Sequence, residues 1–573
     1  MIEGLHPALI LIMGGALLLA VRGPARAWLT VALPVLSFIN FTGLDVGMSE
    51  TWMMAGLELH VLHVDKMALL FGTLFHVAAL IAGIYAMHVD DRVQHSTGMM
   101  YAGSAVGAVL AGDLMTLFIF WEMLAVTSVF QIWARKTARA RGAGMRYLLM
   151  HVLSGLFLLA GAACLHLETG DLRLRQLDLV ALGPELAGLA PWLILVAVGI
   201  KSCFPFVHTW LVDAYPEATP TGTVFLSAFT TKTAVYVLAR TFAGEDLLIY
   251  VGATMAMFPI YFAVIENDLR RVLGYSMINQ IGFMVVGIGI GTELAVNGAV
   301  AHAFNDVIFK GLLFMTMGAV LHRVGHCNGS DLGHLRKSMP FTALCCIVGA
   351  ASISAFPLFS GFISKSMVMS GAALGGYTVV WLVLLFASAG VFHHAGIKIP
   401  FFAFFGHDHG VRVEKPPLNM RVAMGLGAVA CIVLGSYPPL LYGMLPFPVD
   451  YVPYDLTHVS TQIQILCWSA LAFTLLMVTK IYPPELHSTN LDADWFWRKP
   501  IKGLVVALAG VSGQSYRRLG SGVEGMLRRV GAWLRVHHSP GGTIGEPWPT
   551  GSSALSAAVM LALFLLLSLG AHR

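Results

Sequence analysis

Apolar runs long enough to cross a membrane recur along the whole chain. A bilayer core requires about 17–25 consecutive, mostly apolar residues of α-helix, and such runs extend from near residue 5 to near residue 571. The chain is 57% hydrophobic and only 12% charged, which is too little charge to cover a soluble protein of this length. The runs also lack the alternation of a barrel strand. The sequence therefore predicts an all-α polytopic membrane protein.

We expect about 14–16 transmembrane helices, counted from sixteen candidate runs. Their approximate ranges are 5–21, 27–44, 66–87, 97–112, 114–133, 146–167, 190–212, 219–242, 247–265, 270–290, 295–322, 341–370, 376–404, 421–443, 461–482 and 552–571. Proline removes a backbone donor and breaks the helical ladder. The seventh and twelfth runs should therefore be interrupted, near Pro205 and at Pro357–Gly361.

The charges in the predicted loops separate onto two sides of the membrane. One side receives the basic residues Arg22, Arg26, Arg135, Lys136, Arg139, Arg141, Arg270, Arg271, Arg323, Arg336, Lys337, Arg412, Lys415 and Arg421. The other receives Asp45, Glu50, Glu58, Glu245, Asp246, Glu293, Asp450 and Asp455, with a mixed loop at 168–185. The positive-inside rule places the basic side in the cytoplasm and both termini outside. The expected location is the bacterial cytoplasmic (inner) membrane.

Residues 483–551 have a different composition. Their basic residues, interspersed with apolar ones, include Arg517, Arg518, Arg528, Arg529 and Arg535. The pattern predicts a basic amphipathic segment on the cytoplasmic surface or along a neighbouring protein of the same complex. The alternative is a disordered linker to the last helix, and the Pro- and Gly-rich piece 538–551 is interpreted as a plain linker.

Five charged side chains lie inside apolar runs that are predicted to cross the membrane: Glu122, Lys201, Lys232, Lys310 and Lys365. A charge at mid-membrane costs at least ~2.5–3.5 kcal/mol on insertion scales. A lysine removed from water binds its proton less tightly, so a buried lysine beside a carboxylate can act as a proton switch. The set predicts a path for ions or protons. The alternatives are a structural hydrogen-bonding role for Glu122 and snorkelling to the interface for Lys365.

Other polar residues are predicted to share a helical face with Lys310 and with Lys201. His302, Asn305, Asp306 and Lys310 fall at i, i+3, i+4 and i+8, so they share one helical face and predict a wet surface. His208 follows Lys201 by seven residues, which predicts the same face. The threonines around Lys232 either line this path or join helices, and the pair His393-His394 is open between a proton role and a structural one.

Several other functions are excluded. The formal net charge of +4 is too small to suggest nucleic-acid binding. The seven cysteines include no CxxC pair, so we expect no metal, cluster or other cofactor. The GIGIG stretch at 287–291 lies within an apolar run and not after a strand, so it does not indicate a nucleotide site.

Several ordered blocks resemble one known family. They are LFIFWEML, the stretch KSCFPFVHTWLVDAYPEATPTGTVFLSAFTTKTAVYVLAR, NDLRRVLGYSMINQIGFM, NDVIFKGLLF and FPLFSGFISKSMV. The chain resembles the antiporter-like subunits of respiratory complex I, membrane-bound hydrogenases and multisubunit (Mrp-type) cation/proton antiporters. The closest resemblance is to the D-type subunits of the Mrp-type antiporters, in which an Asp can stand where Asp306 stands here.

The resemblance implies two inverted five-helix repeats, each with one broken helix. The implied organisation is 1–96 (N-terminal helices), 97–242 (first repeat), 247–404 (second repeat), 405–482 (C-terminal helices), 483–551 (surface segment) and 552–573 (last helix). It also implies a central axis of charge, in which Glu122 and Lys201 couple in the first repeat, Lys232 links the repeats, and Lys310 and Lys365 serve the second. Two departures are the missing lysine after Asp268-Leu269 and the short C-terminal segment.

These observations lead to one expected function. The chain should be a proton-translocating subunit of a cation/proton (Na⁺/H⁺) antiporter and not an enzyme by itself, with protons carried by Glu122, Lys201, His208, Lys232, His302, Asp306, Lys310 and Lys365. Its expected partners are other membrane subunits, the lipid bilayer and H⁺, with Na⁺ as a second candidate ion. The alternative is an energy-coupling subunit of a hydrogenase, complex I-like or carbon-uptake complex.

Overall fold

A computed structural model describes residues 5–54, 56–179, 186–487, 490–539 and 550–570. The chain divides into two compact units, Met1–Asp492 and Ala493–Arg573. Most of the predicted linker 538–551, part of the 168–185 loop, and the side chains of Arg517 and Arg518 lie outside the described residues.

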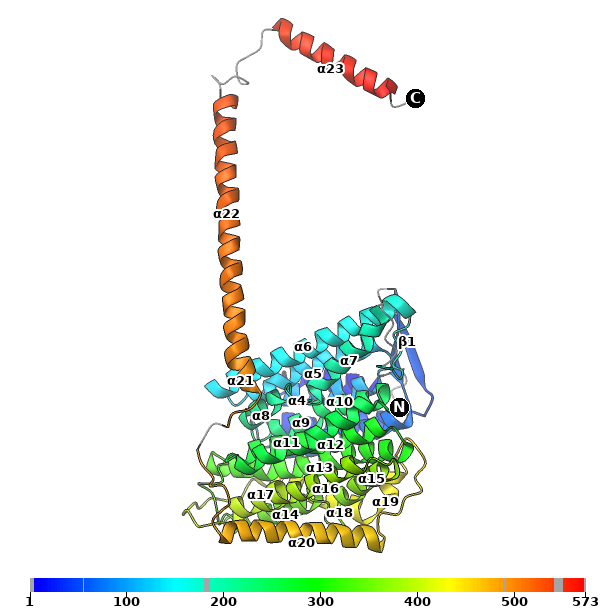
Figure 1. Cartoon of the computed structure of the whole chain (residues 1–573), viewed down its shortest axis with the longest axis vertical. Helices are drawn as coiled ribbons and strands as arrows, with labels where there is room; N and C mark the ends of the chain where they lie inside the picture. Colours follow the sequence, from blue (N-terminus) through cyan, green and yellow to red (C-terminus); the bar gives the residue numbers. More distant parts are fainter. Residues whose placement is uncertain (1–4, 55, 180–185, 488–489, 540–549, 571–573) are drawn as a thin grey trace. The chain divides into compact units, whose positions relative to one another are not determined.

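The first unit is a bundle of helices that run side by side, with a two-stranded sheet at one end (Figure 1). Its elements are α1 (Pro7–Leu17), α2 (Pro24–Phe41), β1 (Ser49–Met54), β2 (Leu57–His63), α3 (Lys66–Ala86), α4 (Arg92–Leu110), α5 (Leu114–Trp133), α6 (Ala138–Thr169), α7 (Leu186–Lys201), α8 (Thr209–Ala214), η1 (Tyr215–Glu217), α9 (Gly222–Ala228), α10 (Thr230–Thr241), α11 (Asp246–Ile265), α12 (Leu269–Ile290), α13 (Glu293–Val324), α14 (Pro340–Ile353), α15 (Ser360–Leu374), α16 (Thr378–Val391), η2 (Phe392–Ile397), α17 (Lys398–Pro400), η3 (Phe401–Phe405), α18 (Leu418–Ser436), α19 (Pro438–Tyr442) and α20 (Leu456–Val478). The second unit contains α21 (Asp494–Phe496), η4 (Trp497–Ile501), α22 (Lys502–His538) and α23 (Thr550–Gly570).

The helices confirm an all-α membrane protein. Within the described residues, eleven helices are long and apolar enough to cross a membrane, and four more are apolar but shorter. Every predicted run overlaps a helix. The run at 97–112 forms α4, which is long enough to span but carries Gln94, His95, Ser96 and Thr97 in its first turns.

The sheet is a hairpin that the sequence did not lead us to expect. Strands β1 and β2 pair antiparallel, with Ser49 opposite His63 and Met54 opposite Leu57. A hydrogen bond links the hairpin to the bundle: the backbone N–H of His60 donates to the carboxylate of Asp113, at 2.6 Å. The alternation in LELHVLH is the period-2 signal of a strand, but it lies among acidic residues that predict a loop.

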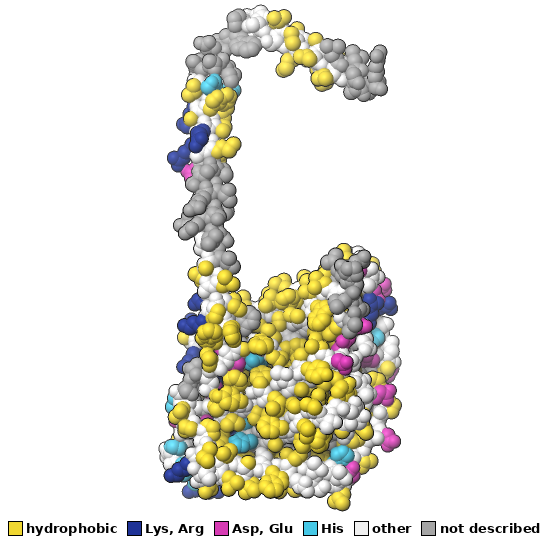
Figure 2. Space-filling view, viewed as in Figure 1, with side chains coloured by type: hydrophobic (Ala, Val, Ile, Leu, Met, Phe, Trp, Pro, Cys, Tyr) yellow, Lys and Arg dark blue, Asp and Glu magenta, His cyan; other side chains and the backbone are white. Residues whose placement is uncertain are grey.

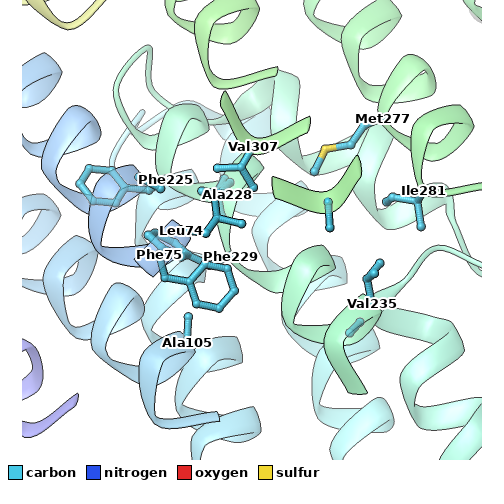
Figure 3. Packing of buried hydrophobic residues seen from close by; sticks show 14 of the residues in the cluster. Leu74, Phe75, Ala105, Phe225, Ala228, Phe229, Val235, Met277, Ile281 and Val307 are labelled. Carbon is cyan, nitrogen blue, oxygen red and sulfur yellow. The ribbon is translucent and has the colours of Figure 1, made fainter. Parts of the chain in front are cut away.

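An apolar cluster joins helices from both halves of the first unit (Figure 3). Phe229 lies between α9 and α10, where the predicted run 219–242 is kinked. Its ring packs edge-on against Phe75 of α3 and Tyr101 of α4, with centroids 5.5 and 5.0 Å away. Aromatic contacts of this kind add to the free energy of apolar burial, so they hold the kink in place.

The surface of the first unit is that of a membrane protein. Figure 2 shows hydrophobic side chains over most of the visible face of the bundle, and acidic side chains along the edge where the hairpin stands. A soluble monomer rarely exposes an apolar patch of this extent. In the second unit, α22 exposes both apolar side chains, such as Leu527 and Trp533, and basic ones, such as Arg528.

Candidate ion-translocation site

Two helices of the first unit are broken inside their predicted spans. Helix α7 ends at Lys201 and α8 begins at Thr209, while α14 ends at Ile353 and α15 begins at Ser360. Non-glycine residues with positive φ occur in both breaks: Cys203, Phe206, Ala355 and Leu358. This backbone conformation costs free energy for residues with a Cβ and is concentrated at functional sites. The breaks lie where the prolines predicted them.

Side chains satisfy the carbonyl groups that the breaks release. Trp210 donates its indole N–H to the Ile200 carbonyl at 2.9 Å, and the Lys365 ammonium donates to the Ile353 carbonyl at 2.7 Å. The Lys365 ammonium also lies 5.0 Å from the centroid of Phe283. Because only 2% of Lys365 is exposed, the snorkelling interpretation of this residue is wrong. A broken helix inside a membrane is tolerated when its freed groups are satisfied in this way.

Lys201 and Glu122 lie near each other at the end of α7. Lys201 is fully buried, and its ammonium donates to the carbonyl of Trp121 at 2.6 Å and lies 4.2 Å from the centroid of that ring. Glu122, on α5, is close enough for its charge to interact with that of Lys201. Helix α6 makes room for the carboxylate with Gly155, since a Cβ at that position would overlap Glu122 Oε1. The two predicted residues therefore lie within electrostatic range of each other, without a direct ion-pair contact.

The centre of the bundle holds a second pair of opposite charges. Lys232 of α10 and Asp306 of α13 are both fully buried, with 2.6 Å between Nζ and Oδ2. The sequence grouped Asp306 with Lys310 on one helical face, and did not predict its partner across the helix interface. Asp306 also interacts electrostatically with Lys310 and Lys365. It is therefore the carboxylate that the three lysines share.

Lys310 and His302 lie on the same helix, α13, among polar side chains. Both are fully buried. His302 bonds through Nδ1 to Ser364 at 2.9 Å and through Nε2 to Gln280 at 3.2 Å. Lys310 donates to the carbonyl of Leu273 at 3.4 Å. The polar face predicted from helical spacing is therefore directed into the protein, where it joins α12 to α15.

His208 does not extend the row from Lys201. The prediction required an unbroken helix over seven residues, but α7 ends at Lys201, so helical spacing does not apply beyond it. His208 instead lies 3.3 Å from the carboxylate of Asp492, and Tyr275 donates its hydroxyl to the same carboxylate at 2.8 Å. The His208 ring packs against Phe258. The prediction of a shared face is wrong for this reason.

A fifth buried lysine among the described residues was not predicted from the sequence. Lys398 is fully buried, with 2.9 Å between its ammonium and the carboxylate of Glu485. It also donates to the carbonyls of Val264 and Glu266, at 2.7 and 2.6 Å. It follows the π-helical turn η2, which carries the buried His394, and π-turns occur frequently at functional sites. The same argument that selected the other lysines would have found it inside the run 376–404.

One protein family matches the central part of the chain. Residues 111–392, which contain both broken helices and all five predicted charges, match the family described as NADH:quinone oxidoreductase/Mrp antiporter, TM. The chain belongs to this family. It is an antiporter-like membrane subunit.

Individual family members show how far the likeness extends. The A-type subunit of the Na⁺/H⁺ antiporter of Alkalihalophilus pseudofirmus is 28% identical over 72% of this chain and 58% of its own length. The D-type subunit of the Bacillus subtilis Na⁺/H⁺ antiporter is 25% identical over 67% of this chain and 80% of its own length. A chain of the Mrp complex from Dietzia sp. superimposes with a TM-score of 0.76 and 24% identity, over 99% of this chain and 63% of the other. The chain spans about half the length of the A-type relatives that it matches.

Proposed function

We propose that this chain is a proton-translocating subunit of a multisubunit cation/proton antiporter. The observation that carries the proposal is a series of charges within the first unit, from the half-buried Glu122 to the buried Lys201, Lys232–Asp306, Lys310 and Lys365. Buried charges without a function would be replaced by apolar residues at no loss of stability. Their retention is explained if each one binds and releases a proton.

The mechanism follows from the pairing of the charges. A carboxylate close to an ammonium group stabilises its charge, and separation of the two allows the lysine to lose its proton. Asp306 interacts with three lysines, so its movement away from Lys232 toward Lys310 would favour the charged form of the second lysine and the neutral form of the first. Protons would thus move stepwise along the axis, as hydration opens each pair.

The orientation of the chain in the membrane and its two repeats are part of the same proposal. Residues 97–242 and 247–404 would form the two inverted repeats, each containing one of the observed breaks. The charge separation between the predicted loops would place the basic side in the cytoplasm and both termini outside. Na⁺ would be the exchanged ion, and it would cross through this chain or a neighbouring one.

A second candidate function is energy coupling within a redox complex. The family description itself includes NADH:quinone oxidoreductase. In such a complex the same axis would move protons, but electron transfer in the partner proteins would drive it. The identity of the partners therefore decides between the two functions.

The test is purification of the intact complex through a tag on this chain, followed by mass spectrometry and reconstitution into liposomes. The proposal predicts antiporter partners and proton movement driven by a Na⁺ gradient. Co-purified iron–sulfur or flavin proteins, with proton movement driven only by an electron donor, would establish the redox function. A complex that moves protons under neither condition would refute both.

A substitution on α6, the helix next to Glu122, tests whether the position of the Glu122 carboxylate relative to Lys201 matters for transport. In Gly155→Ala, the new methyl group would occupy the position of Glu122 Oε1 and displace the carboxylate. A misplacement of about 1 Å can cost on the order of 10²-fold in a positioned reaction, so we expect at least a tenfold lower proton flux. Flux is measured in proteoliposomes and normalised to assembled protein.

The matched control is Gly142→Ala on the same helix. There the added Cβ would meet only the end of the Arg146 side chain, at 3.3 Å, so flux should stay within twofold of wild type. Equal flux in both variants would show that the position of Glu122 does not matter.

A further inference from the structure

A buried histidine lies next to Lys201 without a structural role of its own. His151 of α6 is fully buried, and neither ring nitrogen has a hydrogen-bond partner among the residues that the structure describes. Its ring packs against those of Tyr147 and Trp210, with centroids 4.1 and 4.5 Å away. An imidazole buried in this way is costly unless its polar atoms are used. An apolar ring would fill the same space at lower cost.

His151 lies within electrostatic range of the first lysine of the axis, Lys201. The link from α7 to α6 is tight, since Ser154, one turn along α6, donates to the carbonyl of Ala197 at 2.6 Å. The imidazole and the ammonium group are therefore held in one compact region.

His151 also packs against Tyr147, whose hydroxyl belongs to a cluster of hydroxyl groups. The Tyr147 hydroxyl lies 2.8 Å from Ser128 Oγ, and Tyr101 and Thr230 are close enough to interact with it electrostatically. The Tyr101 hydroxyl lies 2.5 Å from Thr230 Oγ1. All these groups are buried, at most 1% exposed. They lie on α4, α5, α6 and the start of α10, so four helices contribute to one polar core.

The hydroxyl cluster ends beside the central charge pair. Thr230 is the first residue of α10, and Lys232, the partner of Asp306, is two positions further along. The hydroxyl of Thr231, between them, is buried and has no hydrogen-bond partner among the described residues. Cys203, in the break after Lys201, is close enough to interact electrostatically with Lys232. Polar side chains therefore lie close to both Lys201 and Lys232.

We propose that His151 is a proton-relay residue that connects Lys201 with the Lys232–Asp306 pair through the hydroxyls of Tyr147, Tyr101 and Thr230. The inference rests on the proposed function and adds a path within the first repeat. Histidine suits this position because it can accept a proton on one ring nitrogen and release one from the other.

The transfer balances at every group. The Lys201 ammonium gives one proton to His151 and becomes neutral, and the imidazolium passes a proton to the hydroxyl cluster. Each hydroxyl accepts one proton and releases one, directly or through water between them. The proton arrives at neutral Lys232, whose new charge is stabilised by Asp306. The relay groups return to their starting state when their hydroxyls and imidazole reorient.

The test is His151→Phe in the reconstituted complex. Phenylalanine retains a ring against Tyr147 and Trp210 but removes both nitrogens, so we expect proton flux to fall at least tenfold while the unfolding temperature is unchanged or higher. The opposite behaviour is expected for His76→Phe. His76 is equally buried but is hydrogen-bonded to Ser37 at 2.8 Å and to the Gly72 carbonyl at 2.7 Å, so this variant should lose stability and retain flux per assembled complex.

A second readout separates proton transfer from packing. In His151→Ala, added imidazole should restore part of the flux, and the restored flux should depend on the pH through the imidazole titration. The relay is refuted if His151→Phe translocates like wild type while Lys201→Ala does not. If Lys201→Ala also translocates normally, the proposed function fails, and the relay with it.

Discussion

Replacing Lys201 with alanine is expected to abolish proton translocation while the protein still inserts and assembles. Lys201 forms the end of α7, and its ammonium is the group that interacts with Glu122 and with His151. A positioned proton-transfer group contributes on the order of 10²–10⁴-fold to a rate, so flux should fall by about 10²-fold or to background. Flux is measured as the change in internal pH of proteoliposomes at a fixed membrane potential.

Assembly should survive this change because the lysine is costly to bury. Its removal deletes one hydrogen bond to the Trp121 carbonyl, and also the cost of holding an ammonium group away from water. Lys66→Ala is the control, since Lys66 is exposed at the start of α3 and its loss should leave flux unchanged. Normal flux in assembled Lys201→Ala would remove Lys201 from the path.

Breaking the Lys232–Asp306 pair should cost both stability and transport, and removing the whole pair should cost only transport. Asp306→Asn leaves the ammonium of Lys232 buried without its counter-charge, which costs about 3–5 kcal/mol for a buried pair. We expect a lower unfolding temperature, a lower yield of the complex and background flux. In Lys232→Met/Asp306→Leu no charge remains, so the unfolding temperature should return to that of wild type or exceed it, while flux stays at background.

An exposed pair with the same separation provides the control. Arg412 and Asp408 are also 2.6 Å apart, but their side chains are 53% and 38% exposed, and exposed pairs contribute about 0–1 kcal/mol. Asp408→Asn should therefore alter neither stability nor flux measurably. A double variant of Lys232 and Asp306 that still moves protons would show that the pair is structural.

Local sequence patterns predicted the helices and their breaks. A proline removes a hydrogen bond at a known position, so the interruptions before Thr209 and Ser360 follow from the chain alone. The cost of burying a charge likewise singled out Glu122 and Lys201. These effects depend on residues next to one another, and one sequence is enough to read them.

Contacts between distant helices did not follow from local patterns. Asp306 shares a helical face with Lys310, yet its ion pair is formed with Lys232 on another helix. The pairing depends on how α10 and α13 pack, which residue spacing does not determine. The error for His208 arose within one segment of the chain. Helical spacing was applied across the break after Lys201, although the same sequence predicted that break.

Buried residues near the ends of spans were also missed. Lys398 lies close to the end of a predicted run, and Glu485 lies in a segment interpreted as surface, yet the pair is almost fully buried. The segment after α20 places Glu485 and Asp492 back against the bundle, where they meet Lys398 and His208. Such a return of the chain depends on tertiary contacts and leaves no periodic signal in the sequence.

Whether the buried charges act as one axis is tested most directly by blocking its second half alone. The measurement is proton flux at a fixed membrane potential in proteoliposomes that contain the intact complex with Lys310→Met. Methionine retains the apolar volume of the lysine but cannot carry a proton. The account predicts background flux, although Glu122, Lys201 and the Lys232–Asp306 pair are unchanged. Flux equal to that of wild type would contradict a single axis.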